Sequence, residues 1–280
     1  MSGDIRLSVA LVTRNRPVSL QRCLESLRAQ SSQTREVIVS DDSDDEFAAE
    51  TRRIAGLFDA RWIAGPRRGL YANRNFAALQ CAGTHIRTMD DDHTFPAGHF
   101  ALCLAAVLND PHAVWTTGEV GFVNGKYFAK ADTAGQLCPS GVAGPVADPD
   151  NNWAIADGST IYPVEVFKQG LRMVEDFGYG SSYLEFGAFL YRHGFRSRCV
   201  SGALIVHHAA PVTLGRYNPE STLFASLCFN LHFRPGVLRA VRYSVPKLLR
   251  VPSLMGKVPS LVRKAKLRWE TAGKEEIRRV

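Results

Sequence analysis

The chain has 280 residues, of which 45% are hydrophobic and 22% charged, a composition that is ordinary for a globular protein and excludes a disordered or fibrous one. Its net charge of +7 is concentrated in residues 236–280, where twelve Lys and Arg accompany three Asp and Glu, so the first 235 residues are close to neutral. This distribution argues against a nucleic-acid enzyme, which would spread basic charge over its working face.

Six cysteines are scattered along the chain without a CxxC pair, which argues against a structural zinc site and favours reduced thiols. The first residues do not resemble a signal peptide, and no window approaches the ~20 apolar residues that span a bilayer. We therefore expect a cytoplasmic protein.

The first forty residues predict a strand, a helix and a second strand. Leu7–Val12 is a continuous apolar run, which is typical of a parallel strand buried on both faces. Pro17 suits the first turn of a helix, and an apolar stripe at helical spacing follows it. Glu36–Ser40 is a second short strand that runs into Asp41 and Asp42, so this region predicts a βαβ unit.

The same alternation of strands and helices continues to about residue 125. The expected strands are Arg61–Ala64, His85–Met89, Val114–Thr117 and Val120–Val123, and the expected helices are Leu70–Gln80 and His99–Leu108. We therefore expect an α/β fold with an open sheet, in which polar loops and bound ligands lie at the carboxyl ends of the strands.

The next portion of the chain is less regular. Residues 126–150 are rich in Gly, Pro, Ala and Asp and predict a long irregular loop. The elements expected after it are a short strand within Trp153–Pro163, helices over Val164–Gln169, Tyr183–His193 and Leu223–Phe233, and strands over Phe195–Val200 and Ala203–Val206.

Residues 236–280, the basic tail, mix cationic and apolar side chains at helical spacings. Pro246, Pro252 and Pro259 are expected to cut the tail into short helices. Two hypotheses fit this composition. The tail is either a helical extension packed on the body of the protein, or an amphipathic segment that binds an anionic membrane surface, where each basic residue contributes roughly 1 kcal/mol.

Three consecutive acids, Asp90, Asp91 and Asp92, follow the predicted strand His85–Met89. Unpaired carboxylates repel one another, and their burial is costly unless a cation compensates. A divalent cation shared with diphosphate oxygens would supply that compensation, because hard cations take oxygen ligands. Alternatively, the acids form a solvated turn that caps the next helix.

Two further polar segments adjoin predicted elements. Asp41 and Asp42 end a strand, where an acid can accept hydrogen bonds from a ribose or a base, or can cap a helix. Gly69 would let the backbone approach a ligand, and Arg74 and Asn75 lie on the helix after it. Arg74 would pair with a phosphate, orient an aspartate or form a surface salt bridge.

The order and spacing of four segments make the chain similar to the family 2 inverting glycosyltransferases of GT-A fold. The segments are LSVALVTRNRP, EVIVSDDSDD, RGLYANRNFAALQCAGTHIRTMDDDHTFP and FGYGSSYLEFGAFLYRHGFR, which together span about residues 6–210 with a gap in the middle. The resemblance implies a GT-A type open, mixed, mainly parallel sheet flanked by helices, with a C-terminal helical extension.

The resemblance also implies how a nucleotide-sugar is held. Thr13, Arg14 and Asn15 stand where the family's first loop touches the nucleotide. Asp42 stands at the acid that binds the base in the family, with Asp41 beside it. By the same resemblance, the segment around Gly69, Arg74 and Asn75 belongs to the nucleotide-sugar site.

A metal site is implied by the same comparison. Asp90 and Asp92 match the outer acids of the DxD motif, which in the family holds Mn²⁺ or Mg²⁺ on the sugar diphosphate, and Asp91 lies between them. His207 or His208 matches a histidine that some relatives place near the metal. Either one can instead be a partly buried structural histidine.

An inverting transferase needs a general base, which takes the proton of the acceptor hydroxyl as its oxygen attacks the anomeric carbon. The family pattern carries Glu-Asp at the place that Ser181 and Ser182 occupy here. Glu185 would share a helix face with Ser182 and is the first candidate for the base, and Asp176 is the second. Glu185 can also be an ordinary exposed acid of that helix. Residues 157–160 stand where the family's acceptor-side wall begins.

Together these features predict a catalytic domain over residues 1–235, with a nucleotide-sugar half over about 1–125 and an acceptor half over about 126–235, followed by the basic tail. The predicted function is metal-dependent, inverting transfer of a sugar from a nucleotide-sugar to a hydroxyl of a glycan or lipid-linked acceptor. The predicted setting is the cytoplasm and the assembly of a cell-envelope polysaccharide or glycolipid. If the tail binds a membrane, the protein would lie at the inner face of the cell membrane.

Two other functions share some of these features. A nucleotidyltransferase also combines an α/β nucleotide fold with metal-binding acids, but the loop TRNRP lacks the glycine expected there. A non-catalytic sugar-nucleotide binder would account for the missing Glu-Asp pair.

Overall fold

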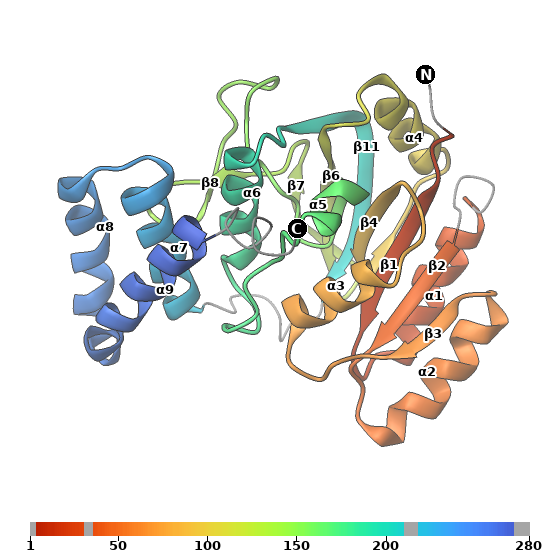
Figure 1. Cartoon of the computed structure of the whole chain (residues 1–280). Helices are drawn as coiled ribbons and strands as arrows, with labels where there is room; N and C mark the ends of the chain where they lie inside the picture. Colours follow the sequence, from red (N-terminus) through yellow and green to blue (C-terminus); the bar gives the residue numbers. More distant parts are fainter. Residues whose placement is uncertain (1–3, 31–35, 210–217, 272–280) are drawn as a thin grey trace, which may run out of the picture.

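A computed structural model describes residues 4–30, 36–209 and 218–271 of the chain (Figure 1). Within these residues the centre is a nine-stranded sheet in the order β3-β2-β1-β4-β10-β6-β11-β5, with β7 paired to β6. The strands are β1 (Leu7–Thr13), β2 (Glu36–Asp41), β3 (Arg61–Ala64), β4 (His85–Asp90), β5 (His93–Thr94), β6 (Val114–Val123), β7 (Lys126–Ala131), β10 (Ser159–Pro163) and β11 (Ser197–Ala209). A separate short pair consists of β8 (Gln136–Leu137) and β9 (Ala143–Gly144).

The sheet is mixed and mainly parallel, as the sequence predicts. β1 runs parallel to β2 and β4, β2 to β3, and β6 to β11. β10 lies between β4 and β6 and is antiparallel to both. β5 pairs antiparallel with β11, and β7 pairs antiparallel with β6. The parallel half therefore brings the carboxyl ends of β1, β2 and β4 to one edge, where ligands bind in such sheets.

Helices cover both faces of the sheet (Figure 1). α1 (Pro17–Arg28), α2 (Asp45–Leu57) and α4 (His99–Asn109) pack on one face, and α3 (Leu70–Leu79), α5 (Val164–Lys168) and α6 (Ser182–Arg192) pack on the other. The central strand β1 is buried throughout because its alternate side chains enter the two cores: Val9 and Leu11 on one side, Ala10 and Val12 on the other. This arrangement is the physical reason for its uninterrupted apolar run.

Three predictions for the middle of the chain were wrong in detail. The expected irregular loop begins with β7, whose backbone pairs antiparallel with β6. Each of the two expected strand pairs is a single strand: β6 runs straight through Gly118, and β11 is continuous with a register shift between Cys199 and Leu204. A bulge of this kind absorbs extra residues without ending the strand, so an apparent break in the pattern is a poor boundary signal. Helix α2 and strand β5 were not predicted.

The last helices gather at one end of the molecule (Figure 1). They are α7 (Pro219–Cys228), the π-helical turn η3 (Phe229–Phe233), α8 (Val237–Arg250), the 3₁₀ helix η4 (Pro252–Lys257) and α9 (Val258–Thr271). Pro252 and Pro259 lie at helix starts, but Pro246 lies inside α8 and does not end it, contrary to the prediction. The predicted boundary at residue 235 falls between η3 and α8. No helix among the described residues is long and apolar enough to cross a membrane.

The tail is tied to the body by Glu185, the acid that the sequence suggested as general base. The Glu185 side chain is fully buried in α6, and its carboxylate accepts hydrogen bonds from Arg268 Nε at 3.2 Å and Trp269 Nε1 at 2.9 Å. The Arg268 guanidinium also lies 3.6 Å from the centre of the Phe189 ring. Since no surface of this carboxylate is open to an acceptor, its observed role is to anchor α9.

We predict that Glu185→Gln destabilises the fold by about 3 kcal/mol, because removing one partner of a buried ion pair leaves the other charge uncompensated. Chemical denaturation of the full chain measures this change. Glu220→Gln is the matched control: Glu220 pairs with Lys257 nearer the surface, and its loss should cost less than about 1 kcal/mol. Equal losses in the two variants would contradict the anchoring role.

Candidate active site

The acid cluster begins with Asp90, the last residue of β4, whose carboxylate is held by Arg74 of α3. Arg74 is completely buried, donates to Asp90 Oδ2 at 2.6 Å, and also pairs with Asp157, which precedes β10. Gly158 leaves room for the Asp90 carboxylate, because a Cβ at this position would lie 2.6 Å from Asp90 Oδ2. Its φ of +76° also favours glycine. Arg74 therefore orients two aspartates, one of the three alternatives raised by the sequence.

Asp91 is fully buried between the loop after β1 and the start of α1. Thr13 Oγ1 donates to Asp91 Oδ2 at 2.5 Å, and Arg16 Nη2 lies 2.5 Å from Asp91 Oδ1. Burial raises the pKa of Asp91, and the neighbouring Arg16 charge only partly offsets this effect. Asp91 thus joins the first loop to the acid cluster and has no surface available to a ligand.

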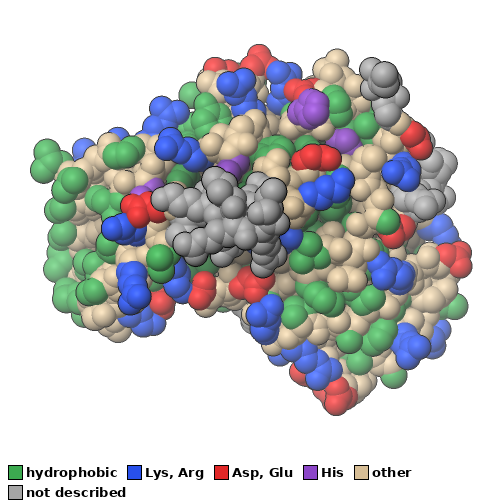
Figure 2. All heavy atoms as spheres, viewed as in Figure 1, with side chains coloured by type: hydrophobic (Ala, Val, Ile, Leu, Met, Phe, Trp, Pro, Cys, Tyr) green, Lys and Arg blue, Asp and Glu red, His purple; other side chains and the backbone are tan. Residues whose placement is uncertain are grey.

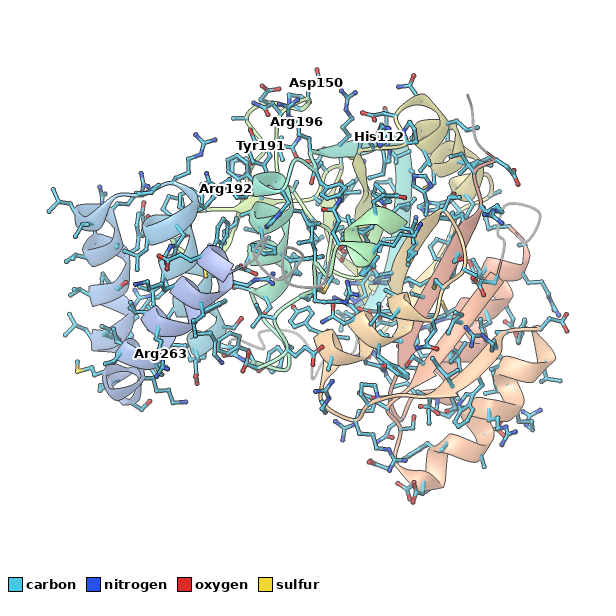
Figure 3. All side chains as sticks on the ribbon, viewed as in Figure 1. His112, Asp150, Tyr191, Arg192, Arg196 and Arg263 are labelled. Atoms are coloured by element: carbon cyan, nitrogen blue, oxygen red, sulfur yellow. The ribbon has the colours of Figure 1, made fainter. Side chains whose placement is uncertain are left out.

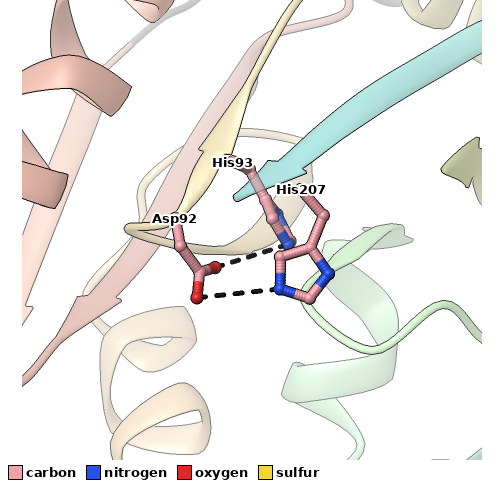
Figure 4. A group of neighbouring side chains, drawn as sticks. All are labelled: Asp92, His93 and His207. Atoms are coloured by element: carbon pink, nitrogen blue, oxygen red, sulfur yellow. Dashed lines mark ion pairs between the residues drawn. The ribbon is translucent and has the colours of Figure 1, made fainter. Parts of the chain in front are cut away.

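Asp92 lies beside two histidines (Figure 4). Its Oδ1 is 3.7 Å from His93 Nε2, and its Oδ2 is 3.7 Å from His207 Nε2. The short strand β5 pairs antiparallel with β11 so that His93 and His207 are direct cross-strand neighbours. One ligand atom from each of the three residues lies within 4.8 Å of the others, a spacing that can hold a metal ion.

Glu119 of β6 fixes the orientation of His207. Its Oε1 lies 2.7 Å from His207 Nδ1, which leaves Nε2 facing Asp92. A carboxylate behind a histidine is the arrangement that orients metal-ligating imidazoles in proteins. Burial lowers the pKa of His207, but its interactions with Asp92 and Glu119 outweigh burial and raise this pKa to about 10.

The electrostatics of the cluster also fit a divalent cation. The acidic side chains are Asp90, Asp91, Asp92, Glu119 and Asp157, and the basic side chains paired with them are Arg16, Arg74 and His207. Acidic side chains therefore outnumber basic ones. Burial raises the pKa of Asp92, but its interactions with His207, His93 and Arg16 hold the pKa well below the ordinary value, so this carboxylate is charged. Within the described part of the chain, the buried atoms Asp92 Oδ1 and His93 Nδ1 have no hydrogen-bond partner.

Two of the four predicted metal ligands, Asp90 and His208, are not in this group of three. His208 follows His207 on β11 and therefore points to the opposite side of the strand, where its Nε2 lies 2.9 Å from Thr94 Oγ1. Asp90 is engaged by Arg74 and is not among the three residues with metal-binding spacing. The structure adds His93, which the sequence analysis did not select.

The two loops that were predicted to bind the nucleotide are joined to each other by hydrogen bonds. Asn15, at a φ of 55°, donates through Nδ2 to Asp44 and accepts from the Asp44 backbone N–H, which joins the loop after β1 to the loop after β2. Arg14, between these contacts, keeps an exposed side chain 3.9 Å from Asp44. Of the three residues predicted in the first loop, Arg14 is the one whose side chain is free to meet a ligand.

Asp41 and Asp42 end β2 with buried side chains. Asp41 accepts hydrogen bonds from the Ser43 backbone and from Trp62 Nε1, so it holds the strand end together. Asp42 accepts from the Arg67 backbone N–H at 2.8 Å, and burial raises its pKa. Asp42 is 7% exposed, and the nearby Arg14 charge partly offsets the effect of burial on its pKa.

Gly69 and Asn75 support a segment of the chain that precedes α6. Gly69, at a φ of +100°, lies so close to Gly178 that an added Cβ would be 2.9 Å from the Gly178 Cα. Asn75 exchanges hydrogen bonds with the Met173 backbone in both directions. The close approach permitted by Gly69 is therefore to this chain's own backbone.

Asp176, the second candidate for the base, lies in the same segment. It is half exposed, pairs with Lys264 of α9 at 2.6 Å, and lines a cavity of about 870 Å³ between residues 173–176 and α9. Both predicted bases thus contact the tail. In contrast, Asp157 contacts the acid cluster through Arg74, and its side chain is 38% exposed.

Sequence reasoning missed several residues of the site, although signals for them exist. His93 directly follows the acids, Arg16 lies in the first loop, and Glu119 is the single acid within an otherwise apolar and small-residue strand. An acid within such a strand signals a polar partner, here His207.

Comparisons with known proteins show the family and the fold. The sequence model described as glycosyl transferase family 2 matches residues 8–171. The search of curated proteins found no match. Among solved structures, GalNAc-T7 with UDP, GalNAc and Mn²⁺ superposes with a TM-score of 0.70 at 14% identity, over 100% of this chain and 58% of that one.

S. aureus TarS residues 1–349 in complex with UDP-GlcNAc superposes with a TM-score of 0.61 at 16% identity, over 96% of this chain and 79% of that one. Longer S. aureus TarS gives 0.59 at 15% identity over 88% of this chain and 44% of that one, so this chain spans only about half of GalNAc-T7 and of TarS. At such identities the likeness shows a shared GT-A fold. Because the family model covers more than half of the sequence, the chain belongs to glycosyl transferase family 2.

Proposed function

We propose that the chain uses a divalent metal to transfer a sugar from a UDP-sugar to an acceptor hydroxyl, with inversion at the anomeric carbon. The observation that carries the proposal is the group Asp92, His93 and His207, which has metal-ligand spacing and lies beside an excess of buried carboxylates. The choice of uridine rests on GalNAc-T7 and TarS, which share the fold and were solved with UDP or UDP-GlcNAc.

The donor atoms favour Mn²⁺ over Mg²⁺. Two imidazoles and one carboxylate make a mixed nitrogen and oxygen set, whereas Mg²⁺ prefers oxygen ligands alone. Asp92, His93 and His207 would hold the ion, which would displace the proton from His207 Nε2, and Glu119 would accept the hydrogen bond from Nδ1–H. When bound there, the ion would neutralise negative charge on the diphosphate leaving group.

The nucleotide would lie across the loops after β1 and β2. Arg14 supplies an exposed guanidinium there, and the Asp42 carboxylate would accept a hydrogen bond from the base. Thr13, Asn15 and Asp41 would act indirectly, by fixing the shape of these loops. Arg74 would act through Asp90, which it holds at the end of β4.

We assign the general base to Asp157 in place of Glu185 and Asp176. Asp157 is partly exposed and shares Arg74 with Asp90. Burial raises the pKa of Asp157, which brings a carboxylate nearer to the pH at which general bases work best. In the proposed reaction Asp157 takes the proton of the acceptor hydroxyl while that oxygen bonds to the anomeric carbon and the sugar–diphosphate bond breaks.

The acceptor in this proposal is a glycan or a lipid-linked sugar used to build a cell-envelope polysaccharide or glycolipid. Family membership supports a sugar acceptor, and the exposed apolar surface of the tail supports work close to lipid. A non-catalytic sugar-nucleotide binder is the second candidate, favoured by Ser181 and Ser182 at the place of the family's acidic pair.

We predict that His207→Ala weakens Mn²⁺ binding in the presence of UDP by more than about tenfold and abolishes most transfer, because it removes one of the proposed ligands. Isothermal titration with Mn²⁺ measures the binding directly. His208→Ala is the matched control, since the neighbouring imidazole bonds Thr94 on the other side of β11 and should leave Mn²⁺ affinity unchanged. If the His208 variant loses affinity and the His207 variant keeps it, the assigned site is wrong.

We predict that Asp157→Asn lowers kcat by about 10²–10⁴-fold, with little change in the KM of the UDP-sugar, because the acceptor proton has no base. In wild type kcat should fall at low pH, since a base works only when it is deprotonated. In the variant, which lacks the carboxylate, this fall of kcat at low pH should disappear. Asp176→Asn serves as the control and should keep most activity. Retention of anomeric configuration in the product, read by NMR, would refute both the inverting mechanism and this base.

A further inference from the structure

Helix α8 exposes a continuous apolar stripe. Leu238, Val241, Val245 and Leu249 are spaced so that they share one face of the helix, and their exposed fractions are 89%, 53%, 45% and 69%. In Figure 2 hydrophobic side chains run along the edge of the molecule where α8 lies in Figure 1. Single exposed leucines are common on protein surfaces, but an unpaired stripe along a whole helix marks an interaction surface.

Apart from Met255 and Leu267, the large apolar side chains of η4 and α9 pack into cores. Leu261 and Ala265 of α9 are buried in a core shared with α7, and Trp269 packs against Phe189 of the body. Leu254, in the short helix after α8, enters the same core. The tail therefore has two parts: α9 holds the tail on the protein, and α8 presents the apolar stripe outward.

Helix α8 carries basic residues and no acidic one. No Asp or Glu occurs between Glu220 and Glu270, a span that includes all of α8 and η4 and the part of α7 after Glu220. Arg242 and Arg250 of α8 are exposed next to the stripe. Long basic side chains can lay their stems along apolar surface and keep the charge at the polar boundary.

We propose that α8 docks on the surface of an anionic lipid bilayer, with the stripe in the acyl boundary and the arginines among the headgroups. An apolar face with a basic, acid-free border is the composition of helices that lie in membrane interfaces. A second copy of the chain fits less well, because two such faces would bring like charges together. This assignment is independent of the metal site and of the transfer reaction.

The test uses the full-length chain and flotation with vesicles of phosphatidylcholine alone or with phosphatidylglycerol added. Wild type should float with the anionic vesicles and stay behind with the neutral ones. Leu238→Gln/Leu249→Gln should reduce the bound fraction, with a partition coefficient lower by at least about tenfold. Both side chains are exposed, so the thermal unfolding midpoint should stay that of wild type.

Two control variants match the change in chemistry on the body of the protein. Leu57→Gln/Leu108→Gln replaces leucines that are 56% and 53% exposed at the ends of α2 and α4, and should float like wild type. Arg242→Gln/Arg250→Gln should weaken flotation more than Arg192→Gln/Arg196→Gln, a pair labelled in Figure 3 at the end of α6 and the start of β11.

Two kinds of result would overturn the proposal, one from flotation and one from the oligomeric state. One is equal flotation of the α8 leucine variant and wild type, or equal flotation of wild type with neutral and anionic vesicles. The other is a set of three observations: wild type is a dimer in solution by light scattering, the α8 leucine variant is a monomer, and neither protein binds vesicles. That second result would assign the stripe to self-association.

Discussion

The structure depends on how a cluster of buried carboxylates is neutralised. Asp90 ends strand β4 and Asp91 and Asp92 follow it directly, at a place where the surrounding sheet leaves little water to screen them. Arg74 forms an ion pair with Asp90, and Arg16 forms ion pairs with the two acids that follow it. Even with these contacts, acidic side chains outnumber basic ones beside two histidines, an arrangement that suits a divalent cation with its diphosphate.

Much of the fold could be predicted from the sequence because strong local patterns coincide with tertiary burial. The run Leu7–Val12 is apolar because both faces of β1 are covered, and the acids after His85–Met89 stand at a strand end as expected. Strand continuity through Gly118 could not be predicted, since it depends on pairing with β10 and β11 rather than on local propensity. Pro246 likewise predicts the end of a helix, but it lies inside α8.

The candidate site was predicted in outline but not in its individual contacts. A sequence shows that acids and histidines occur, but cross-strand register decides which of them meet. The pairing of β5 with β11 selects His93 and His207, and side-chain alternation turns His208 away. Glu185 illustrates the reverse case: its helical position suggested chemistry, whereas contacts with Arg268, 83 residues further along the chain, make it structural.

The central claim is that Asp92, His93 and His207 hold the metal that serves the leaving diphosphate. The most direct measurement is a crystal structure of the chain grown with Mn²⁺ and UDP, with X-ray data that record the anomalous scattering of manganese. The account predicts one strong anomalous peak bonded to Asp92 and the two histidines and adjacent to the diphosphate. Bound UDP without manganese at these residues, or manganese bound at other residues, would contradict it.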